Sequence, residues 1–263
     1  MIEVPAGLSR WRGEPGGAAW LDRLPSLVAE CAEAWSLRLG RPFEPATISL
    51  VVPAKLPDGR RAVLKLNFPE PESEQEAEAL AHWRGQGAVR LLAADAERRA
   101  LLVERADPGT QLWERPDDEA SRALAAVLRL LHRDPPPPRH PFRLLGDEAR
   151  RWTDAHPQLR ATVADLLAGE TPDAVLHQDL HGGNVLLTGD GWAAIDPKPL
   201  VGDPAFDVAS LVRDRRPVRD RRLVSRRLDL LHDELGYDRE RMRAWSWVHA
   251  LAWGHPAEAR LLA

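Results

Sequence analysis

The spacing of apolar residues near the start of the chain changes from a helical to an extended pattern. In residues 17–39, apolar side chains recur every three or four positions, which predicts an amphipathic helix. The β-branched run at 46–53, a Pro-Asp-Gly turn signal at 57–59 and the apolar run at 60–66 follow. Together these three segments predict a β-hairpin.

A second change of pattern comes near residue 107. Before it, an acidic helix at 72–84 and a strand pair within 88–107 complete a β-rich first part. After it, we expect helices at 117–133 and 147–168, a strand at 174–180, a hairpin at 185–197 and three helices from 205 onward. The pattern predicts an α+β fold with two lobes, a small antiparallel N-terminal lobe at 1–106 and a mainly helical C-terminal lobe at 107–263.

Composition narrows the class of protein. Of the 263 residues, 44% are apolar and 29% are charged, which is typical of a folded globular protein. The net charge of -4, without a concentrated basic stripe, argues against a nucleic-acid partner. No apolar run approaches the roughly 18 residues of a membrane span, and no signal-peptide pattern begins the chain. We therefore expect a cytoplasmic protein without a membrane partner; its oligomeric state cannot be read from the sequence.

Two residue counts add to this picture. A single cysteine, Cys31, excludes an internal disulfide framework and a multi-cysteine zinc site. Lysine occurs only at Lys55, Lys65 and Lys198, although the chain has 36 basic residues. GC-rich coding explains the excess of arginine, but the remaining lysines become candidates for roles that need a compact point charge.

Candidate chemistry concentrates in residues 175–207. Asn184 follows Asp179 by five positions, and Asp196 ends the second strand of the expected hairpin. The hairpin would return Asp196 to the side of the other two, so that two carboxylates and an amide oxygen converge. Hard oxygen ligands of this kind suit magnesium. A carboxylate beside bound magnesium can also accept a proton from a hydroxyl group.

A different metal site is an alternative for the same segment. His177, Asp179 and His181 alternate along an extended stretch, and alternating residues share one face of a strand. That site would need further ligands, and it leaves Asn184 and Lys65 unexplained. We therefore favour structural roles for both histidines.

The spacing of Asp179, Asn184 and Asp196 matches the catalytic and metal-binding residues of protein kinases. Such a site also needs a lysine on an N-lobe strand, paired with a glutamate on a helix. Lys65 lies on an expected strand, and an acidic helix follows it. Among the glutamates of that helix, we select Glu76 as the partner of Lys65 over its neighbours Glu74 and Glu78.

At these residues the chain resembles the aminoglycoside phosphotransferases, a branch of the protein-kinase-like fold. It is most similar to the streptomycin 6-phosphotransferases and hydroxyurea kinases. The motifs that carry this resemblance are AAWLDRLPSLV at 18–28, AVLKL at 62–66, GQGAVRLL at 85–92, LLVERADPG at 101–109 and IDPKPLVGDPAFDVA at 195–209. They cover nearly the whole chain.

The resemblance implies that ATP binds between the lobes. Adenine would contact backbone groups of Glu104, Arg105 and Ala106, while Lys65 would hold the α- and β-phosphates and Glu76 would position Lys65. The phosphate-covering loop would lie near residues 49–54, beginning at Ser49, where this chain has no Gly-x-Gly.

The resemblance also assigns the reacting groups. Asp179 would be the catalytic base, and Asn184 and Asp196 would hold Mg²⁺. One departure lies between His177 and Asp179, where relatives usually have glycine and this chain has Gln178. That difference could alter the acceptor pocket.

Lys198 follows Asp196 by two positions, and the resemblance includes it without assigning a role. A short stretch past Asp196 should keep its ammonium close to the transferred phosphate, where it could neutralise developing charge. The competing interpretation is that Lys198 pairs with Asp203 or Asp207 and fixes the loop, because we expect those two carboxylates to hold the catalytic segment through backbone N–H groups.

The expected activity is an ATP-dependent transfer of phosphate to a hydroxyl of a small molecule. An aminoglycoside such as streptomycin is the first choice of acceptor, which would make the reaction antibiotic inactivation. A hydroxyurea-like or sugar acceptor remains open, as does a nucleotide-binding pseudokinase without turnover. Carboxylates that could bind a polycationic acceptor are Asp147, Glu148, Asp154, Asp233 and Glu234.

Overall fold

The computed structural model describes residues 2–213 and 220–263. The chain forms two compact units. The first comprises Met1–Arg84 with Val89–Arg105, and the second comprises Gly85–Ala88 with Ala106–Ala263. An antiparallel sheet dominates the first and helices dominate the second, so the α+β fold class is confirmed.

The sheet of the first unit has five antiparallel strands in the order β1-β2-β3-β5-β4. Their bounds are Arg38–Leu39, Ser49–Lys55, Arg61–Asn67, Ala100–Glu104 and Leu91–Asp95 in that order. The central strand β3 carries Lys65, which lies opposite Val51 of β2 and Leu101 of β5. This pairing on both sides fixes the position of Lys65 along the strand direction of the sheet.

Helix α1, Gly17–Ala34, contributes its apolar face to the core of the first unit. Its apolar face, including Leu24, Val28 and Cys31, is buried in one cluster with sheet residues such as Leu50 and Leu64. A 3₁₀-helix, Ala6–Gly13, adds Leu8 and Trp11 to this cluster. The amphipathic pattern at the start of the chain therefore belongs to a helix that packs on the sheet.

The prediction that this helix runs to residue 39 is wrong. The helix ends at Ala34, and Ser36 has a positive φ of 52°. Leu39 then pairs with Ala54 in the antiparallel β1–β2 ladder. Strand pairing takes over the last apolar positions of the helical pattern.

The expected phosphate-covering loop near 49–54 is also corrected. Those residues form β2, which pairs with β3 along its whole length from Ser49 to Lys55. The hairpin turn follows at residues 57–59, where Gly59 has a φ of 90°. The absence of Gly-x-Gly is explained, because a regular strand needs no such backbone freedom.

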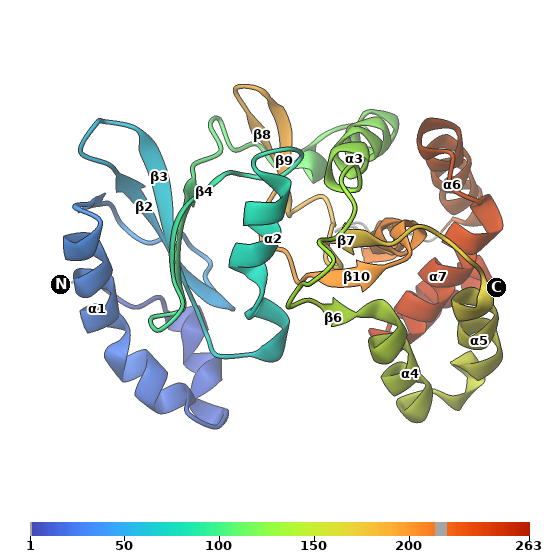
Figure 1. The fold of residues 1–263 in the computed structure, drawn as a ribbon, viewed down its shortest axis with the longest axis horizontal. Coiled ribbons are helices and arrows are strands. Elements are labelled where there is room, and N and C mark those ends of the chain that lie inside the picture. Colours follow the sequence, from blue (N-terminus) through green and yellow to red (C-terminus); the bar gives the residue numbers. More distant parts are fainter. Residues whose placement is uncertain (1, 214–219) are drawn as a thin grey trace. The chain divides into compact units, whose positions relative to one another are not determined.

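Helix α2, Glu76–Trp83, lies against β4 in the same unit (Figure 1). A 3₁₀ turn at Pro71–Ser73 precedes it, so the helix is shorter than the predicted 72–84. Glu76 is its first residue and is buried.

The second unit is mainly helical. Its α-helices are α3 at Asp117–Leu131, α4 at Leu145–Ala155, α5 at Arg160–Ala168, α6 at Arg221–Leu235, α7 at Arg239–Ala252 and α8 at Pro256–Leu262. Its 3₁₀-helices are η3 at Leu112–Glu114, η4 at Pro157–Leu159 and η5 at Pro204–Arg213. The single helix predicted at 147–168 is broken where His156 leaves the helical conformation and Pro157 begins η4. The prediction for 214–219 lies outside the described residues.

Two small sheets hold the chemistry-bearing segment. Strands β6 (Arg143–Leu144), β10 (Leu200–Gly202) and β7 (Ala174–Leu176) form one sheet, in that order. Strands β8 (Val185–Thr188) and β9 (Gly191–Ala194) form the predicted hairpin. Residues 177–184, which we name the catalytic loop, connect β7 to β8 (Figure 1). In the described part of the chain, none of the helices has the length and apolarity that crossing a bilayer requires.

Candidate active site

Lys65 and Glu76 form a buried ion pair in the first unit. The Lys65 ammonium lies 2.7 Å from both carboxylate oxygens of Glu76. The two residues are only 7% and 2% exposed. The structure therefore pairs Lys65 with Glu76, the glutamate selected from the sequence, whereas Glu74 pairs with Arg99.

Two further polar side chains extend this pair. The amide nitrogen of Asn67 donates to Oε2 of Glu76 at 2.7 Å, and the hydroxyl of Ser49 donates to Oδ1 of Asn67 at 2.7 Å. All four residues are buried, so the Glu76 carboxylate is fixed by two donors on neighbouring sheet positions. Ser49 thus belongs to the support of Lys65; its contact with a nucleotide stays a prediction.

The expected adenine-binding stretch starts at the end of β5. The backbone N–H of Glu104 donates to the carbonyl of Arg90 at 2.8 Å, and the Arg105 guanidinium lies over the ring of Phe43. Ala106 is the first residue of the second segment of the helical unit. The Glu104 N–H is thus already engaged, and contact of residues 104–106 with adenine stays a prediction.

Asp207 organises the start of the catalytic loop. One carboxylate oxygen accepts from the backbone N–H of His177 at 2.7 Å and the other from the N–H of Gln178 at 2.8 Å. The expectation that Asp207 holds this segment through backbone groups is confirmed. Nε2 of His132, at the end of α3, also lies 2.9 Å from Asp207, a support that the sequence pattern did not indicate.

His177 has a structural contact, as expected. Its Nε2 lies 2.9 Å from the carbonyl oxygen of Ile195 on the returning hairpin. Burial lowers the pKa of His177, and the nearby Asp207 and Asp179 charges oppose that shift. A neutral ring therefore links the catalytic loop to the end of the hairpin.

The hairpin brings Asp179, Asn184 and Asp196 together. The side-chain nitrogen of Asn184 donates to the carbonyl of Asp179 at 3.0 Å, and the N–H of Ile195 donates to the carbonyl of Asn184 at 2.9 Å. Asp196 follows directly, with a φ of 58° that few non-glycine residues adopt. The convergence predicted from the spacing thus has a physical basis in the β8–β9 register.

Lys198 lies beside the candidate base. Its ammonium is 3.8 Å from Oδ2 of Asp179, and its backbone N–H donates to the carbonyl of His177 at 3.0 Å. Asp203, one of its two expected partners, instead accepts from the Arg241 guanidinium and the Trp245 indole. Asp203 therefore fixes α7 rather than the catalytic loop, and Trp245 has the packing role that its apolar surroundings require.

Gln178 occupies a backbone position that favours glycine. Its φ is 67°, a conformation that glycine, the residue implied by the family resemblance, adopts most readily. Here the side chain is anchored, because Nη2 of Arg143 donates to its Oε1 at 3.2 Å and Arg143 also binds Glu148. The departure from the family pattern is therefore accommodated by an arginine on β6.

The carboxylates proposed for a polycationic acceptor are partly occupied. Ion pairs join Asp147 to Arg150, Glu148 to both Arg143 and Arg151, and Glu234 to Arg129. Asp154 and Asp233 lie exposed on α4 and α6. None of them lines the pocket beside the catalytic loop that is described next.

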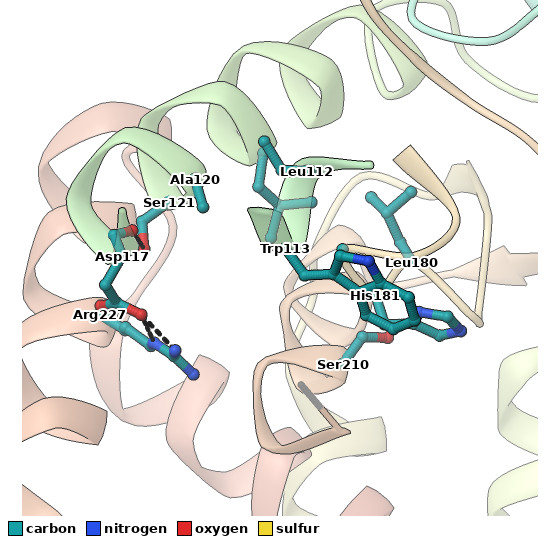
Figure 2. Close-up of a pocket in the computed structure, with 11 residues that line it drawn as sticks. Leu112, Trp113, Asp117, Ala120, Ser121, Leu180, His181, Ser210 and Arg227 are labelled. Atoms are coloured by element: carbon teal, nitrogen blue, oxygen red, sulfur yellow. Dashed lines mark hydrogen bonds and ion pairs between the residues drawn. The ribbon is translucent and has the colours of Figure 1, made fainter. Parts of the chain in front are cut away.

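That pocket is lined by the catalytic loop, η3, α3, η5 and α6; it is open to solvent on one side, and its volume is about 40 Å³ (Figure 2). Trp113 and His181 form one side, and the ion pair between Asp117 and Arg227 lies at the other. Ser210 also lines it and is buried, with no hydrogen-bond partner for its hydroxyl among the described residues. The pocket thus combines an aromatic surface with polar groups.

The alternative metal site is not formed. Across residues 2–213 and 220–263, no three His, Cys, Asp or Glu side chains are grouped so that they could hold a metal ion. Nε2 of His177 is directed to the Ile195 carbonyl instead. One carboxylate and one amide, as in Asp196 and Asn184, require other ligands to complete a shell.

Comparisons with known proteins identify the family of the chain. Residues 38–260 match the aminoglycoside/hydroxyurea antibiotic resistance kinase family. The chain is 38% identical to a streptomycin 6-kinase from Streptomyces griseus, over 95% of this chain and 89% of that protein. It is also 38% identical to a hydroxyurea phosphotransferase from Kitasatospora aureofaciens, over 94% and 77% of the two chains. A choline kinase from Streptococcus pneumoniae shares the fold, with a TM-score of 0.64, 12% identity and coverage of 90% and 91%. The chain therefore belongs to the aminoglycoside/hydroxyurea antibiotic resistance kinase family.

Proposed function

We propose that this protein is an ATP-dependent phosphotransferase that phosphorylates a hydroxyl group of a streptomycin-type aminoglycoside. The observation that carries the proposal is the geometry around Asp179. Its carboxylate lies 3.8 Å from the Lys198 ammonium, and the hairpin that follows it places Asn184 and Asp196 alongside. The family membership and the 38% identity to streptomycin 6-kinase support the acceptor class.

Lys65 would be the main residue that binds the phosphates of ATP. Its buried pairing with Glu76 holds a compact positive charge at one position, which suits the α- and β-phosphates of ATP. Backbone groups of Glu104 and Ala106 would bind the adenine edge, with Arg105 between them in the chain.

Magnesium fits the donor set of the second unit. Because the nitrogen of the Asn184 amide donates to Asp179, the amide oxygen is the atom that can face a cation. With the Asp196 carboxylate this gives two hard oxygen ligands, which phosphate oxygens would complete. Bound there, Mg²⁺ would neutralise charge on the phosphates.

Asp179 and Lys198 would act on the acceptor and the transferred group. As the acceptor oxygen bonds to phosphorus and the bond to ADP breaks, the hydroxyl proton passes to the Asp179 carboxylate. Lys198 would stabilise the negative charge that spreads over the phosphoryl oxygens. Its position beside Asp179 supports this role over one in pinning the loop.

Hydroxyurea is the second acceptor to consider, because the identity to hydroxyurea phosphotransferase equals that to streptomycin 6-kinase. Two streptomycin 6-kinases, from Streptomyces griseus and Streptomyces glaucescens, match the chain at 38% identity, and this supports the aminoglycoside as the first choice. A pseudokinase is disfavoured, because the chain retains Lys65, Asp179, Asn184 and Asp196, the residues that turnover requires.

The test measures phosphate transfer from radiolabelled ATP to streptomycin, hydroxyurea and a sugar panel. We expect transfer to streptomycin, and a loss of about 10²–10⁴-fold in Asp179→Asn with ATP binding retained. Asp190→Asn, an exposed aspartate in the β8–β9 turn, is the matched control and should retain the rate. Transfer by Asp179→Asn at the wild-type rate would refute the role of the base, and transfer to hydroxyurea alone would refute the acceptor.

A further inference from the structure

His181, two residues after the candidate base, is held in one orientation. The backbone N–H of Gly183 donates to Nδ1 of the His181 ring at 3.1 Å. Because Nδ1 accepts this bond, the neutral ring carries its proton on Nε2. Nε2 lies 4.0 Å from Oδ1 of Asp179, so the N–H side of the imidazole is on the side of the candidate base.

Trp113 holds the plane of this ring. The two rings are stacked, with centroids 5.7 Å apart and an interplanar angle of 19° (Figure 2). The Trp113 indole is itself fixed by a hydrogen bond to Gln111 at 2.7 Å, and its backbone N–H donates to the carbonyl of Gly182 at 3.2 Å. A tryptophan, a glutamine and the loop backbone therefore orient one imidazole.

The two glycines of the loop leave the space for this stack. A Cβ on Gly183 would lie 2.6 Å from the Trp113 ring and 2.9 Å from the His181 ring. A Cβ on Gly182 would lie 2.9 Å from the backbone nitrogen of Trp113. A side chain at either position would displace the rings, so the loop is built around the orientation of His181.

The separation of the His181 ring from the Asp179 carboxylate leaves room for one oxygen atom between them. At 4.0 Å the Nε2 and Oδ1 atoms are too far apart to hydrogen-bond to each other. An oxygen placed about 2.8 Å from each can bridge them, accepting from Nε2 and donating to Oδ1. Lys198 lies nearest to the other carboxylate oxygen, Oδ2, so Oδ1 is the atom toward which a hydroxyl would be directed.

We propose that His181 is a further catalytic residue, whose Nε2–H donates to the oxygen of the acceptor hydroxyl while that hydroxyl donates its proton to Oδ1 of Asp179. This inference rests on the proposed function. The hydroxyl oxygen bonds to phosphorus, the bond from phosphorus to ADP breaks, and the hydroxyl proton ends on Asp179. His181 keeps its own proton throughout, so its contribution is orientation of the nucleophile.

The pocket described above lies beside the clamp that Nε2 of His181 and Oδ1 of Asp179 form. Its wall is the Trp113–His181 stack, and the Ser210 hydroxyl, 2% exposed, also lines it. With a volume of about 40 Å³ it has room for one polar group of the acceptor and not for a whole ring.

Three substitutions separate the hydrogen bond from the packing. His181→Gln can place an amide N–H near the position of Nε2, whereas the shorter amide of His181→Asn reaches only the position of Nδ1. His181→Phe keeps a ring on Trp113 and removes the donor. Initial rates with radiolabelled ATP and streptomycin give kcat and KM for both substrates, and thermal melting monitors the fold.

We expect His181→Phe and His181→Asn to lower kcat/KM for streptomycin by about 100-fold. The KM for ATP and the melting temperature should change little in all three variants, and His181→Gln should restore most of the loss. Wild-type kcat/KM in His181→Phe, or equal losses in the Gln and Asn variants, would overturn the clamp. A wild-type protein that transfers to none of the acceptors would instead count against the proposed function.

A measurement made without ATP distinguishes a failure of the His181 inference from a failure of the proposed function. Nitrogen-15 spectra of the histidine side chains report which ring nitrogen of His181 carries the proton, and whether its signal shifts when streptomycin is added. We expect the proton on Nε2 of His181, and we expect the His181 signal to shift when streptomycin is added. Excess NaCl should reverse this shift only if it makes streptomycin dissociate. A proton on Nδ1, or streptomycin that binds without any shift at His181, would overturn the inference whatever the rates show.

Discussion

Removing either member of the Lys65–Glu76 pair should destabilise the first unit far more than a surface substitution does. The charged atoms lie 2.7 Å apart, which corresponds to an attraction of roughly 6 kcal/mol at an effective dielectric constant of about 20. Taking both charges out of water costs a similar amount, so the intact pair contributes little net stability. The single variants Lys65→Met and Glu76→Met each leave one buried charge uncompensated, and each should lower the free energy of unfolding by about 3–5 kcal/mol.

The double variant should be closer to the wild type than either single one. It removes both charges and fills the space with apolar atoms, leaving the Asn67 amide as the group that loses an acceptor. The expected coupling in the double-mutant cycle is therefore at least about 3 kcal/mol. Lys55→Met, at the exposed end of β2, is the matched control and should stay within about 0.5 kcal/mol of the wild type.

Urea unfolding followed by circular dichroism and tryptophan fluorescence measures these values. Losses below about 1 kcal/mol in both single variants, or additivity of the two within about 0.5 kcal/mol, would refute the reasoning. Phosphate transfer should be abolished in both single variants and in the double variant. A stable but inactive double variant would separate the contribution of Lys65 to catalysis from its contribution to folding.

Three more predictions follow from single residues. Lys198→Ala should lower kcat strongly with little change in melting temperature, and Lys198→Arg should retain part of the wild-type kcat. The control variant Lys55→Ala should change neither kcat nor the melting temperature. An unchanged kcat in Lys198→Ala would reject the catalytic role of Lys198. Because burial lowers the pKa of His177, the unfolded chain binds a proton more readily, so the free energy of unfolding should fall as the pH drops below about 6.5, and His177→Gln should flatten that dependence. Burial, aided by the charge of Asp95, raises the pKa of the Cys31 thiol to about 11, so the native protein should not react with a thiol reagent at pH 8 and should react once unfolded in urea.

The parts of the site that could be predicted from the sequence are those that local spacing determines. Asp179, Asn184 and Asp196 lie within one loop and hairpin, so the register of β8 and β9 is enough to bring them together. Glu76 could be selected for Lys65 because a short helix follows the strand. In each case few residues separate the partners, and no long-range packing decides the outcome.

The parts that could not be predicted depend on contacts between distant segments. His132 reaches Asp207 across 75 positions, and Arg241 reaches Asp203 across 38. Glu234 is one of the carboxylates expected to face an acceptor, and nothing in the sequence around it indicates that it binds Arg129, 105 positions away. From the sequence alone, a charged residue in a helix can be interpreted as exposed to solvent or as binding a ligand, and only its partner in the structure decides between the two.

The backbone at Gln178 and Asp196 links these two cases. Both have positive φ, and one directly precedes the candidate base while the other is a candidate metal ligand. Such a conformation costs a non-glycine residue roughly 1 kcal/mol or more and persists only where surrounding contacts determine it. At Gln178 those contacts are the hydrogen bonds from its N–H to Asp207 and from Arg143 to its side chain. Distant residues thus impose on the catalytic loop a geometry that its own sequence opposes, and this explains why the candidate reacting groups could be selected from spacing while the residues that support them could not.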